Sequence, residues 1–367
     1  MVLLIGLFLI GCARAPVRGW SGPVLAGDRV YVGTIKGEVV GLNNSTGSQE
    51  WRFALEGSGG TGSFLGCAGQ ISTAMSIYST PAVKEVEGSI IIYVGDYDGN
   101  VYGIVTGTQM VSKFETDGAI VGSPAIADDT LFIGSSDNNL YAISLDSWGK
   151  KWVFETGDKI WSTPVIDDGV VYIGSSDHNL YAIDAESGAE IWHFEAEGAI
   201  LSTPLVHDGT VYIGSSDRNF YAIDVNQVGK EAEAKGVFEG AGNWFWTQAL
   251  AYDNVIYVGN LDHKFYALDA GNIENKLWEF ETEGMIRTPP VLVKGLIVIG
   301  SEDGHLYAID PETKAMRDFN LETPILAPLY ADTENGVVYT HAQNGEHALY
   351  AIDVESGAQL WKHVTSE

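Results

Sequence analysis

One short pattern recurs in this chain about every 40 residues, a spacing typical of repeat architectures. The clearest copies begin at Pro124, Pro164 and Pro204 and run through Gly-Ser-Ser-Asp to Tyr-Ala-Ile. Looser copies bring the number to eight, and the leading residues are Pro23, Pro81, Pro124, Pro164, Pro204, Ala249, Pro290 and Pro328. A period of this length built from strand-like pieces indicates a propeller or a solenoid.

The copy from Trp161 to Ala196 contains four strand-like runs. They are rich in β-branched and aromatic residues, and Asp-Asp-Gly, Ser-Ser-Asp-His-Asn and Ala-Glu-Ser-Gly separate them. Such runs favour strands, and such separators favour tight turns. Four antiparallel strands make one propeller blade. We therefore predict an all-β fold, a single eight-bladed β-propeller of four-stranded antiparallel blades over residues 20–367, with one continuous apolar interior.

Tryptophans recur in the last strand of the repeat, and we expect them to pack between neighbouring blades. They are Trp51, Trp152, Trp192, Trp278 and Trp361. Two segments break the period. Residues 55–78 form a Gly-rich insertion whose role the sequence leaves open, and Asn226–Gly236 is expected to bulge from the opposite face.

The chain is strongly acidic, with 49 Asp and Glu against 20 Lys and Arg and a net charge of −29. This balance argues against nucleic-acid binding, which needs cations to neutralise phosphates. It also argues against binding an anionic membrane through a basic patch.

Residues 1–11 are mostly apolar and end in Leu9-Ile10-Gly11-Cys12. A run this short suits a signal peptide rather than a membrane span. The ending resembles the lipobox of bacterial lipoproteins, which implies a lipid on Cys12, a tether over residues 12–19, and an exported protein. Its place would be the outer face of the cytoplasmic membrane or the outer membrane. An ordinary signal peptide or a buried strand remains the alternative, and Cys67 offers no disulfide or metal motif.

A candidate binding site lies three positions before each leading residue, at the entry to the innermost strand. These residues are Trp20, Tyr78, Val121, Trp161, Leu201, Trp246, Arg287 and Ile325, and the next position supplies hydroxyls that include Ser162, Ser202, Thr247 and Thr288. An aromatic funnel with polar groups is typical of a recognition site. Alternatively, the aromatic side chains only fill the mouth of the channel.

Acidic residues fall in the same connections and are expected to surround that mouth. They include Glu115, Glu155, Glu195, Glu281 and Glu283. Such a rim would attract a basic partner, or it is simply a solvated surface. The hairpin residues Asp98, Asp137, Asp177, Asp217, Asp262 and Asp303 are expected to bond their own turns. Each stands alone on its blade, so we predict no metal site.

The segments Tyr172 to Trp192 and Tyr339 to Trp361 resemble the PQQ-type propeller repeat. Two groups share this repeat: quinoprotein dehydrogenases, which carry pyrroloquinoline quinone (PQQ) and calcium, and non-catalytic lipoproteins similar to BamB, an outer-membrane assembly factor. The dehydrogenases' adjacent cysteine pair and Trp-Asp-Trp element are absent here. Chain length, lipobox and eight copies resemble the second group.

The resemblance implies a membrane-anchored, non-catalytic scaffold that binds envelope or membrane proteins as a single propeller within a complex. On this interpretation the chain has no catalytic residues and no cofactor. A PQQ- and calcium-dependent oxidoreductase acting on an alcohol or a sugar remains an alternative, so enzymatic activity stays open. A polysaccharide-binding propeller is a third hypothesis, motivated by the aromatic funnel.

Overall fold

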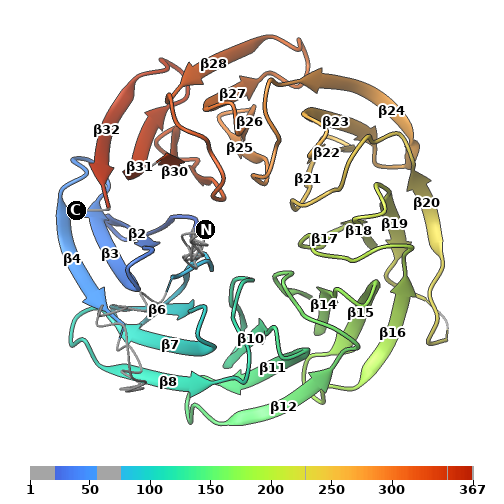
Figure 1. The fold of residues 1–367 in the computed structure, drawn as a ribbon, viewed down its shortest axis with the longest axis horizontal. Helices are drawn as coiled ribbons and strands as arrows, with labels where there is room; N and C mark the ends of the chain where they lie inside the picture. Colours follow the sequence, from blue (N-terminus) through green and yellow to red (C-terminus); the bar gives the residue numbers. More distant parts are fainter. Residues whose placement is uncertain (1–20, 56–75, 228, 345, 366–367) are drawn as a thin grey trace, which may run out of the picture.

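The computed structural model describes residues 21–55, 76–227, 229–344 and 346–365. They form eight four-stranded antiparallel sheets arranged in a ring, each with its strands in chain order (Figure 1). The first strand of each sheet lies nearest the axis and the fourth forms the circumference. Within these ranges there is no helix. The predicted eight-bladed β-propeller is confirmed.

The strands of the first four blades have the following bounds: β1 (Val24–Ala26), β2 (Arg29–Gly33), β3 (Glu38–Asn43) and β4 (Gln49–Ala54); β5 (Ala82–Val86), β6 (Ser89–Gly95), β7 (Asn100–Val105) and β8 (Val111–Glu115); β9 (Ala125–Ala127), β10 (Thr130–Gly134), β11 (Asn139–Ser144) and β12 (Lys150–Glu155); β13 (Val165–Asp167), β14 (Val170–Gly174), β15 (Asn179–Asp184) and β16 (Glu190–Glu195).

The remaining blades follow in the same way: β17 (Leu205–His207), β18 (Thr210–Gly214), β19 (Phe220–Asp224) and β20 (Ala234–Phe238); β21 (Leu250–Tyr252), β22 (Val255–Gly259), β23 (Lys264–Asp269) and β24 (Asn272–Glu281); β25 (Val291–Val293), β26 (Leu296–Gly300), β27 (His305–Ile309) and β28 (Met316–Asn320); β29 (Tyr330–Asp332), β30 (Val337–Asn344), β31 (Glu346–Asp353) and β32 (Gln359–Val364).

The first turn of a blade shows why the repeat contains Asp-Gly. Asp168 and Gly169 join β13 to β14 with positive φ angles of 44° and 75°. Two consecutive positive φ angles define the two-residue hairpin turn whose twist matches paired strands, and Asp-Gly is a favoured sequence for it. Asp208 and Gly209 repeat the turn between β17 and β18, at 46° and 69°.

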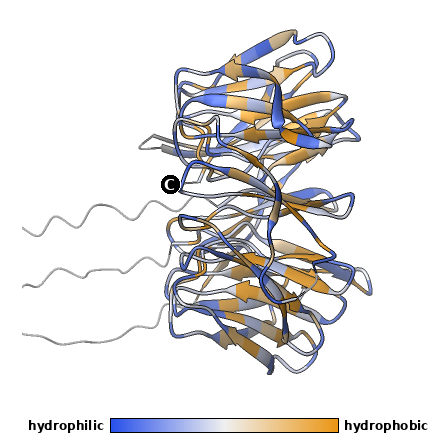
Figure 2. Cartoon of the chain, turned by 90° about the vertical axis from the view of Figure 1, so that its right-hand side faces the viewer, coloured by the Kyte–Doolittle hydropathy of each residue, from blue (hydrophilic) through white to orange (hydrophobic). Residues whose placement is uncertain are grey.

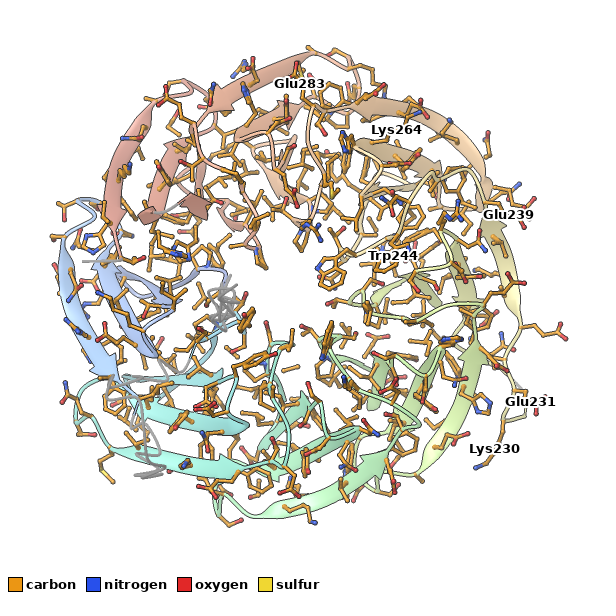
Figure 3. All side chains as sticks on the ribbon, in the orientation of Figure 1. Lys230, Glu231, Glu239, Trp244, Lys264 and Glu283 are labelled. Atoms are coloured by element: carbon orange, nitrogen blue, oxygen red, sulfur yellow. The ribbon has the colours of Figure 1, made fainter. Side chains whose placement is uncertain are left out.

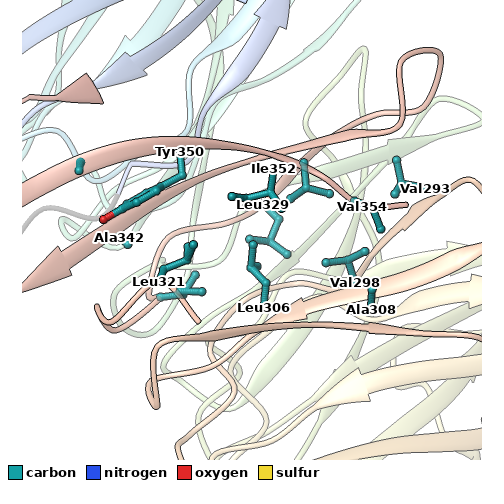
Figure 4. Close-up of a cluster of buried hydrophobic side chains, with 13 residues drawn as sticks. Val293, Val298, Leu306, Ala308, Leu321, Leu329, Ala342, Tyr350, Ile352 and Val354 are labelled. Atoms are coloured by element: carbon teal, nitrogen blue, oxygen red, sulfur yellow. The ribbon is translucent and has the colours of Figure 1, made fainter. Parts of the chain in front are cut away.

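The apolar core is divided into eight clusters, one between each pair of neighbouring blades. Figure 4 shows the cluster between the seventh and eighth blades, where Val298 and Leu306 face Leu329 and Ile352. Seen from the side, the strands carry most of the hydrophobic residues and the loops most of the hydrophilic ones (Figure 2). The expected single interior is wrong because each sheet buries both faces against its neighbours rather than against one centre.

Tryptophans of the outer strands link successive blades, as predicted. The indole Nε1 of Trp152 on β12 donates to the carbonyl oxygen of Ala185 in the next blade at 3.1 Å. Trp192 on β16 repeats the bond to Val225 at 3.2 Å. Each ring therefore adds a directional contact to the apolar packing between two sheets.

Among the residues that the structure describes, the ring closes through side chains, because β29–β32 form the eighth sheet and β1–β4 the first, with no strand shared between them. Trp361 on β32 donates from Nε1 to the carbonyl oxygen of Asn44 at 2.8 Å. Beside it, Val30 and Leu42 of the first blade pack against Tyr339 and Leu349 of the eighth. The junction between the last and first blades is thus built like the others.

The insertion within 226–236 does not simply bulge, as the sequence suggested. His193 on β16 donates from its backbone N–H to Lys230 O at 2.8 Å, and Ala232 N–H donates to His193 O at 2.7 Å. Figure 3 places Lys230 and Glu231 at the circumference. The segment therefore covers part of the outer edge of the fourth blade, which would otherwise present unpaired backbone groups.

Several predictions from the sequence lie outside the described residues: the signal peptide 1–11, Cys12 and its tether, Trp20 and Cys67. Across the ranges that the structure describes, no helix is long and apolar enough to cross a membrane.

Candidate functional site

A cavity opens at the centre of one face of the ring, where connections from outer strands enter the innermost strands of the next blades. It holds about 580 Å³ of empty space, including its open mouth. Its walls are formed by Tyr78, Thr80, Val121, Gly122, Ser123, Trp161, Thr163, Leu201, Thr203, Trp246, Thr247, Gln248, Arg287, Pro289, Leu326 and Pro328. The structure thus brings the predicted Tyr78, Trp161, Trp246 and Arg287 together.

A buried residue directly before Trp161 explains why this side chain faces the axis. Ile160 is fully buried and lies on Gly134, the last residue of β10. A Cβ atom at Gly134 would lie 2.2 Å from Ile160 Cγ2, so only glycine permits this approach. Because Ile160 is fixed in the wall, the next residue, Trp161, turns toward the cavity.

Each aromatic side chain of the cavity is held by a second residue. Trp161 Nε1 donates to Ser136 Oγ at 3.1 Å. The rings of Tyr78 and Tyr97 lie 5.1 Å apart. Burial, with a smaller effect of Tyr97, raises the pKa of Tyr78 to about 12, so its phenol is neutral. These contacts fix the walls before any ligand arrives.

Arg287 is the only charged residue in the cavity wall described by the structure. Its guanidinium lies 6.0 Å from the ring centre of Trp246, within range of a cation–π interaction. Nε donates to Glu302 Oε1, and Nη2 lies 3.3 Å from Met285 Sδ. The carboxylate of Glu302 therefore balances the charge of Arg287.

The predicted hydroxyl ring is buried in the wall instead of facing the cavity. Ser202 Oγ accepts from Gly214 N–H at 3.1 Å and donates to Gly214 O at 2.8 Å. Thr288 makes the same clamp with Gly300, and Ser162 Oγ donates to Ser202 O at 2.8 Å. Ser202 and Thr288 thus hold their connections against the strands, and Ser162 links its connection to the next one.

Thr247 differs from its counterparts. It lines the cavity and is buried, but its hydroxyl finds no hydrogen-bond partner among the described residues. The repeat also departs from its pattern in the next two residues, Gln248 and Ala249. The sixth blade is therefore irregular where it borders the cavity.

The polar groups that reach the cavity lie one position later than predicted, at Thr80, Ser123, Thr163, Thr203 and Gln248. Some of their hydroxyls also link blades: Thr80 N–H donates to Ser123 Oγ at 2.9 Å, and Ser123 N–H donates to Thr163 Oγ1 at 3.0 Å. The sequence does contain this information, in the Ser-Thr-Pro segments at 79–81, 162–164 and 202–204. Successive residues of an extended segment face opposite ways, so when the Ser is buried the Thr faces the cavity.

In the eighth blade the wall residue is Leu326, whereas the sequence pointed to Ile325. Ile325 is fully buried and lies against Gly300. Counting three residues back from Pro328 gives the wrong residue, because Pro328 is separated from its strand by one residue more than Pro164 is. Strand β29 begins two residues after Pro328, whereas β13 begins directly after Pro164.

The acidic residues lie at the circumference of this face rather than at the cavity. Glu115, Glu155, Glu195 and Glu281 end the outermost strands β8, β12, β16 and β24, and all are exposed. Figure 3 shows Glu239 and Glu283 near the outer edge and Trp244 closer to the centre. Lys113 Nζ pairs with Glu115 at 2.7 Å.

The hairpin aspartates fasten each incoming connection to its blade. Asp177 Oδ2 accepts from Tyr181 Oη at 2.8 Å and from Gly157 N–H at 2.6 Å, and Oδ1 accepts from Asn179 N–H at 3.0 Å. Asp137, Asp217, Asp262 and Asp303 repeat the arrangement. Burial and the nearby carboxylate raise the pKa of Tyr181, so its hydroxyl stays a donor.

We expect Asp177→Ala to lower the free energy of unfolding by about 1–3 kcal/mol, because three donors lose a charged acceptor. Tyr181→Phe, which removes only one of these bonds, should cost less. Glu186→Ala, at an exposed turn, should change stability by about 0.5 kcal/mol or less. Urea unfolding of the three variants measures this, and equal midpoints for Asp177→Ala and Glu186→Ala would contradict it.

The described residues do not fit a PQQ and calcium site. PQQ is a polyanion that carries several carboxylates, whereas the only cation in the cavity wall is already paired with Glu302. No group of three or more His, Cys, Asp or Glu is placed to hold a metal in the described part of the chain. We therefore derive no reaction through this cofactor.

Comparisons with known proteins agree with the architecture. A family model described as "Outer membrane protein assembly factor BamB" matches residues 13–65 and 147–232. The crystal structure of BamB from Moraxella catarrhalis superposes with a TM-score of 0.68 at 17% identity, covering 87% of this chain and 92% of that one. The computationally designed Ika8 protein gives 0.71 at 16% identity, covering 91% and 96%. No curated protein matches the sequence. The chain is thus a PQQ-like repeat β-propeller similar to BamB.

Proposed function

We propose that this chain is a non-catalytic scaffold that binds protein partners at the cell envelope, as its similarity to a protein named an assembly factor suggests. The supporting observation is the cavity face: a ring held by side-chain contacts presents exposed aromatic residues around one opening. Trp244 is 45% exposed and Tyr97 is 44% exposed. Aromatic residues are the commonest anchors of protein interfaces.

The proposal includes export and a lipid anchor on Cys12. Such an anchor would hold the ring close to a membrane, whose proteins are then the nearest partners. The exposed carboxylates at the circumference of the cavity face favour a partner with basic residues, through long-range attraction that speeds encounter. Low salt should therefore accelerate association.

The test is photo-crosslinking in cells with the full chain. A crosslinker placed at Trp244 should capture a defined partner, and one at Leu360, on the outer strand β32 and 50% exposed, should not. Tyr97→Ala should reduce capture at Trp244 about tenfold. In the same cells the native chain should sediment with membranes and Cys12→Ser should be released. Equal capture at both positions would refute docking on the cavity face.

A further inference from the structure

The cavity combines aromatic walls with polar groups from many blades. Tyr78, Trp161 and Trp246 belong to the second, fourth and sixth blades, and hydroxyls or amides of Thr80, Thr163, Thr203 and Gln248 lie between them. The polar groups therefore point inward from around a ring rather than along a line. A peptide that binds by adding a strand needs a row of backbone partners at a sheet edge, which this arrangement does not provide.

The charge of the cavity favours a neutral ligand. Arg287 is the one charged wall residue that the structure describes, and Glu302 pairs with it. The guanidinium keeps N–H groups beyond those donated to Glu302 and Met285, because Arg carries five. The pair thus offers donors and acceptors for hydroxyl groups without a net charge to neutralise.

Gln248 of the sixth blade supplies a polar group that the fold leaves available. Gln248 donates from Nε2 to Pro204 O at 2.9 Å, which orients the amide and leaves Oε1 as an acceptor. The preceding Thr247 lacks the clamp that Ser202 and Thr288 make with their strands, but its hydroxyl is buried, so Gln248 is the residue of this irregular segment that can reach a ligand. A departure from a repeat that others obey, placed in a cavity wall, is expected at a binding site.

We propose that this cavity binds a neutral sugar ring. A pyranose presents apolar C–H groups on its faces and hydroxyls around its edge, which matches indole rings beside inward-pointing polar groups. The aromatic side chains are already held, Trp161 by Ser136 and Trp246 beside Arg287, so little ordering is needed on binding. This activity goes beyond protein docking and does not depend on it.

Isothermal titration of the purified full-length chain tests the proposal, with neutral disaccharides of glucose, galactose and N-acetylglucosamine as probes. At least one should bind saturably at about 1 mM or below. Trp161→Ala and Trp246→Ala should each weaken binding about tenfold, as expected for central aromatic anchors. Leu360→Ala, far from the cavity, should leave it unchanged.

Thr247→Val is a second control in the cavity wall. It removes a buried hydroxyl without a described partner that a ligand does not reach, so thermal stability should stay equal or rise and sugar affinity should stay unchanged. The proposal is overturned if none of the sugars binds, if hydrophobic or charged peptides saturate the cavity and the sugars do not, or if Trp161→Ala leaves sugar binding unchanged. Trp244→Ala should weaken partner capture by a crosslinker placed at Tyr97 and leave the sugar titration unchanged, so the two proposals fail separately.

Discussion

Replacing Trp361 with alanine should lower the free energy of unfolding by about 3–5 kcal/mol. Trp361 is 7% exposed, its Nε1 donates to Asn44 O, and its ring packs against Gly47 of the first blade. The substitution removes an indole from the junction that closes the ring, and it leaves a carbonyl without its donor. Urea unfolding followed by circular dichroism gives the difference.

Two further variants are compared with Trp361→Ala. Trp192→Ala removes the equivalent indole between the fourth and fifth blades and should cost a similar amount, because the two junctions are alike. Trp244→Ala, at an exposed position, should change stability by about 0.5 kcal/mol or less. If Trp361→Ala unfolds at the same midpoint as Trp244→Ala, side-chain packing at this junction does not hold the ring closed.

Lowering the pH from 7 to 5 should remove about 2 kcal/mol of stability through His341 alone. His341 is fully buried on β30, and burial, with a smaller effect of His347, lowers its pKa to about 4. The unfolded chain takes up a proton near pH 6.5, whereas the folded chain must keep this imidazole neutral. The contribution of neutral His341 to the free energy of unfolding is therefore fully present above pH 6.5 and falls progressively toward pH 4.

The loss should act at the ring junction. His341 Nδ1 faces Ser21 O of the first blade at 3.3 Å, and Nε2 faces Thr365 Oγ1 at 3.2 Å. His341→Gln should be less stable at pH 7 and have a flatter dependence between pH 7 and 5. His178→Asn is the matched control, because His178 is exposed and Asn138 occupies the equivalent turn with the same positive φ region. Parallel pH profiles for the native chain and His341→Gln would contradict this assignment.

The sequence predicts the fold well because eight copies of one repeat each specify the same kind of blade. Turn residues such as Asp168 and Gly169 specify one hairpin geometry, and apolar runs specify strands. The division of the core was not predictable from composition, since the same residues suit a single interior. It follows from the radial arrangement, in which both faces of every sheet are buried.

For the cavity, counting along the repeat finds Trp161 and Trp246 but places the hydroxyls one residue too early. The repeat shows which residue types recur, but it does not show which of two adjacent side chains points into the cavity. Ser162 is buried and its hydroxyl donates to Ser202 O, whereas the adjacent Thr163 lines the cavity. The carboxylates were misplaced for a related reason: a connection begins at the circumference, so residues early in it, such as Glu155, lie far from the axis.

In the described part of the chain no strand is shared between β29–β32 and β1–β4, and this bears on how such a molecule tolerates rearrangement. Each of the eight described sheets is built from four consecutive strands, so the boundaries between blades rest mainly on side chains, with the backbone bonds of residues 230–232 to His193 as an addition at one of them. A circularly permuted gene that opens the ring between two other sectors would keep every described hydrogen bond within its sheets. Loss or duplication of a whole sector would likewise preserve each unit while changing the diameter of the opening.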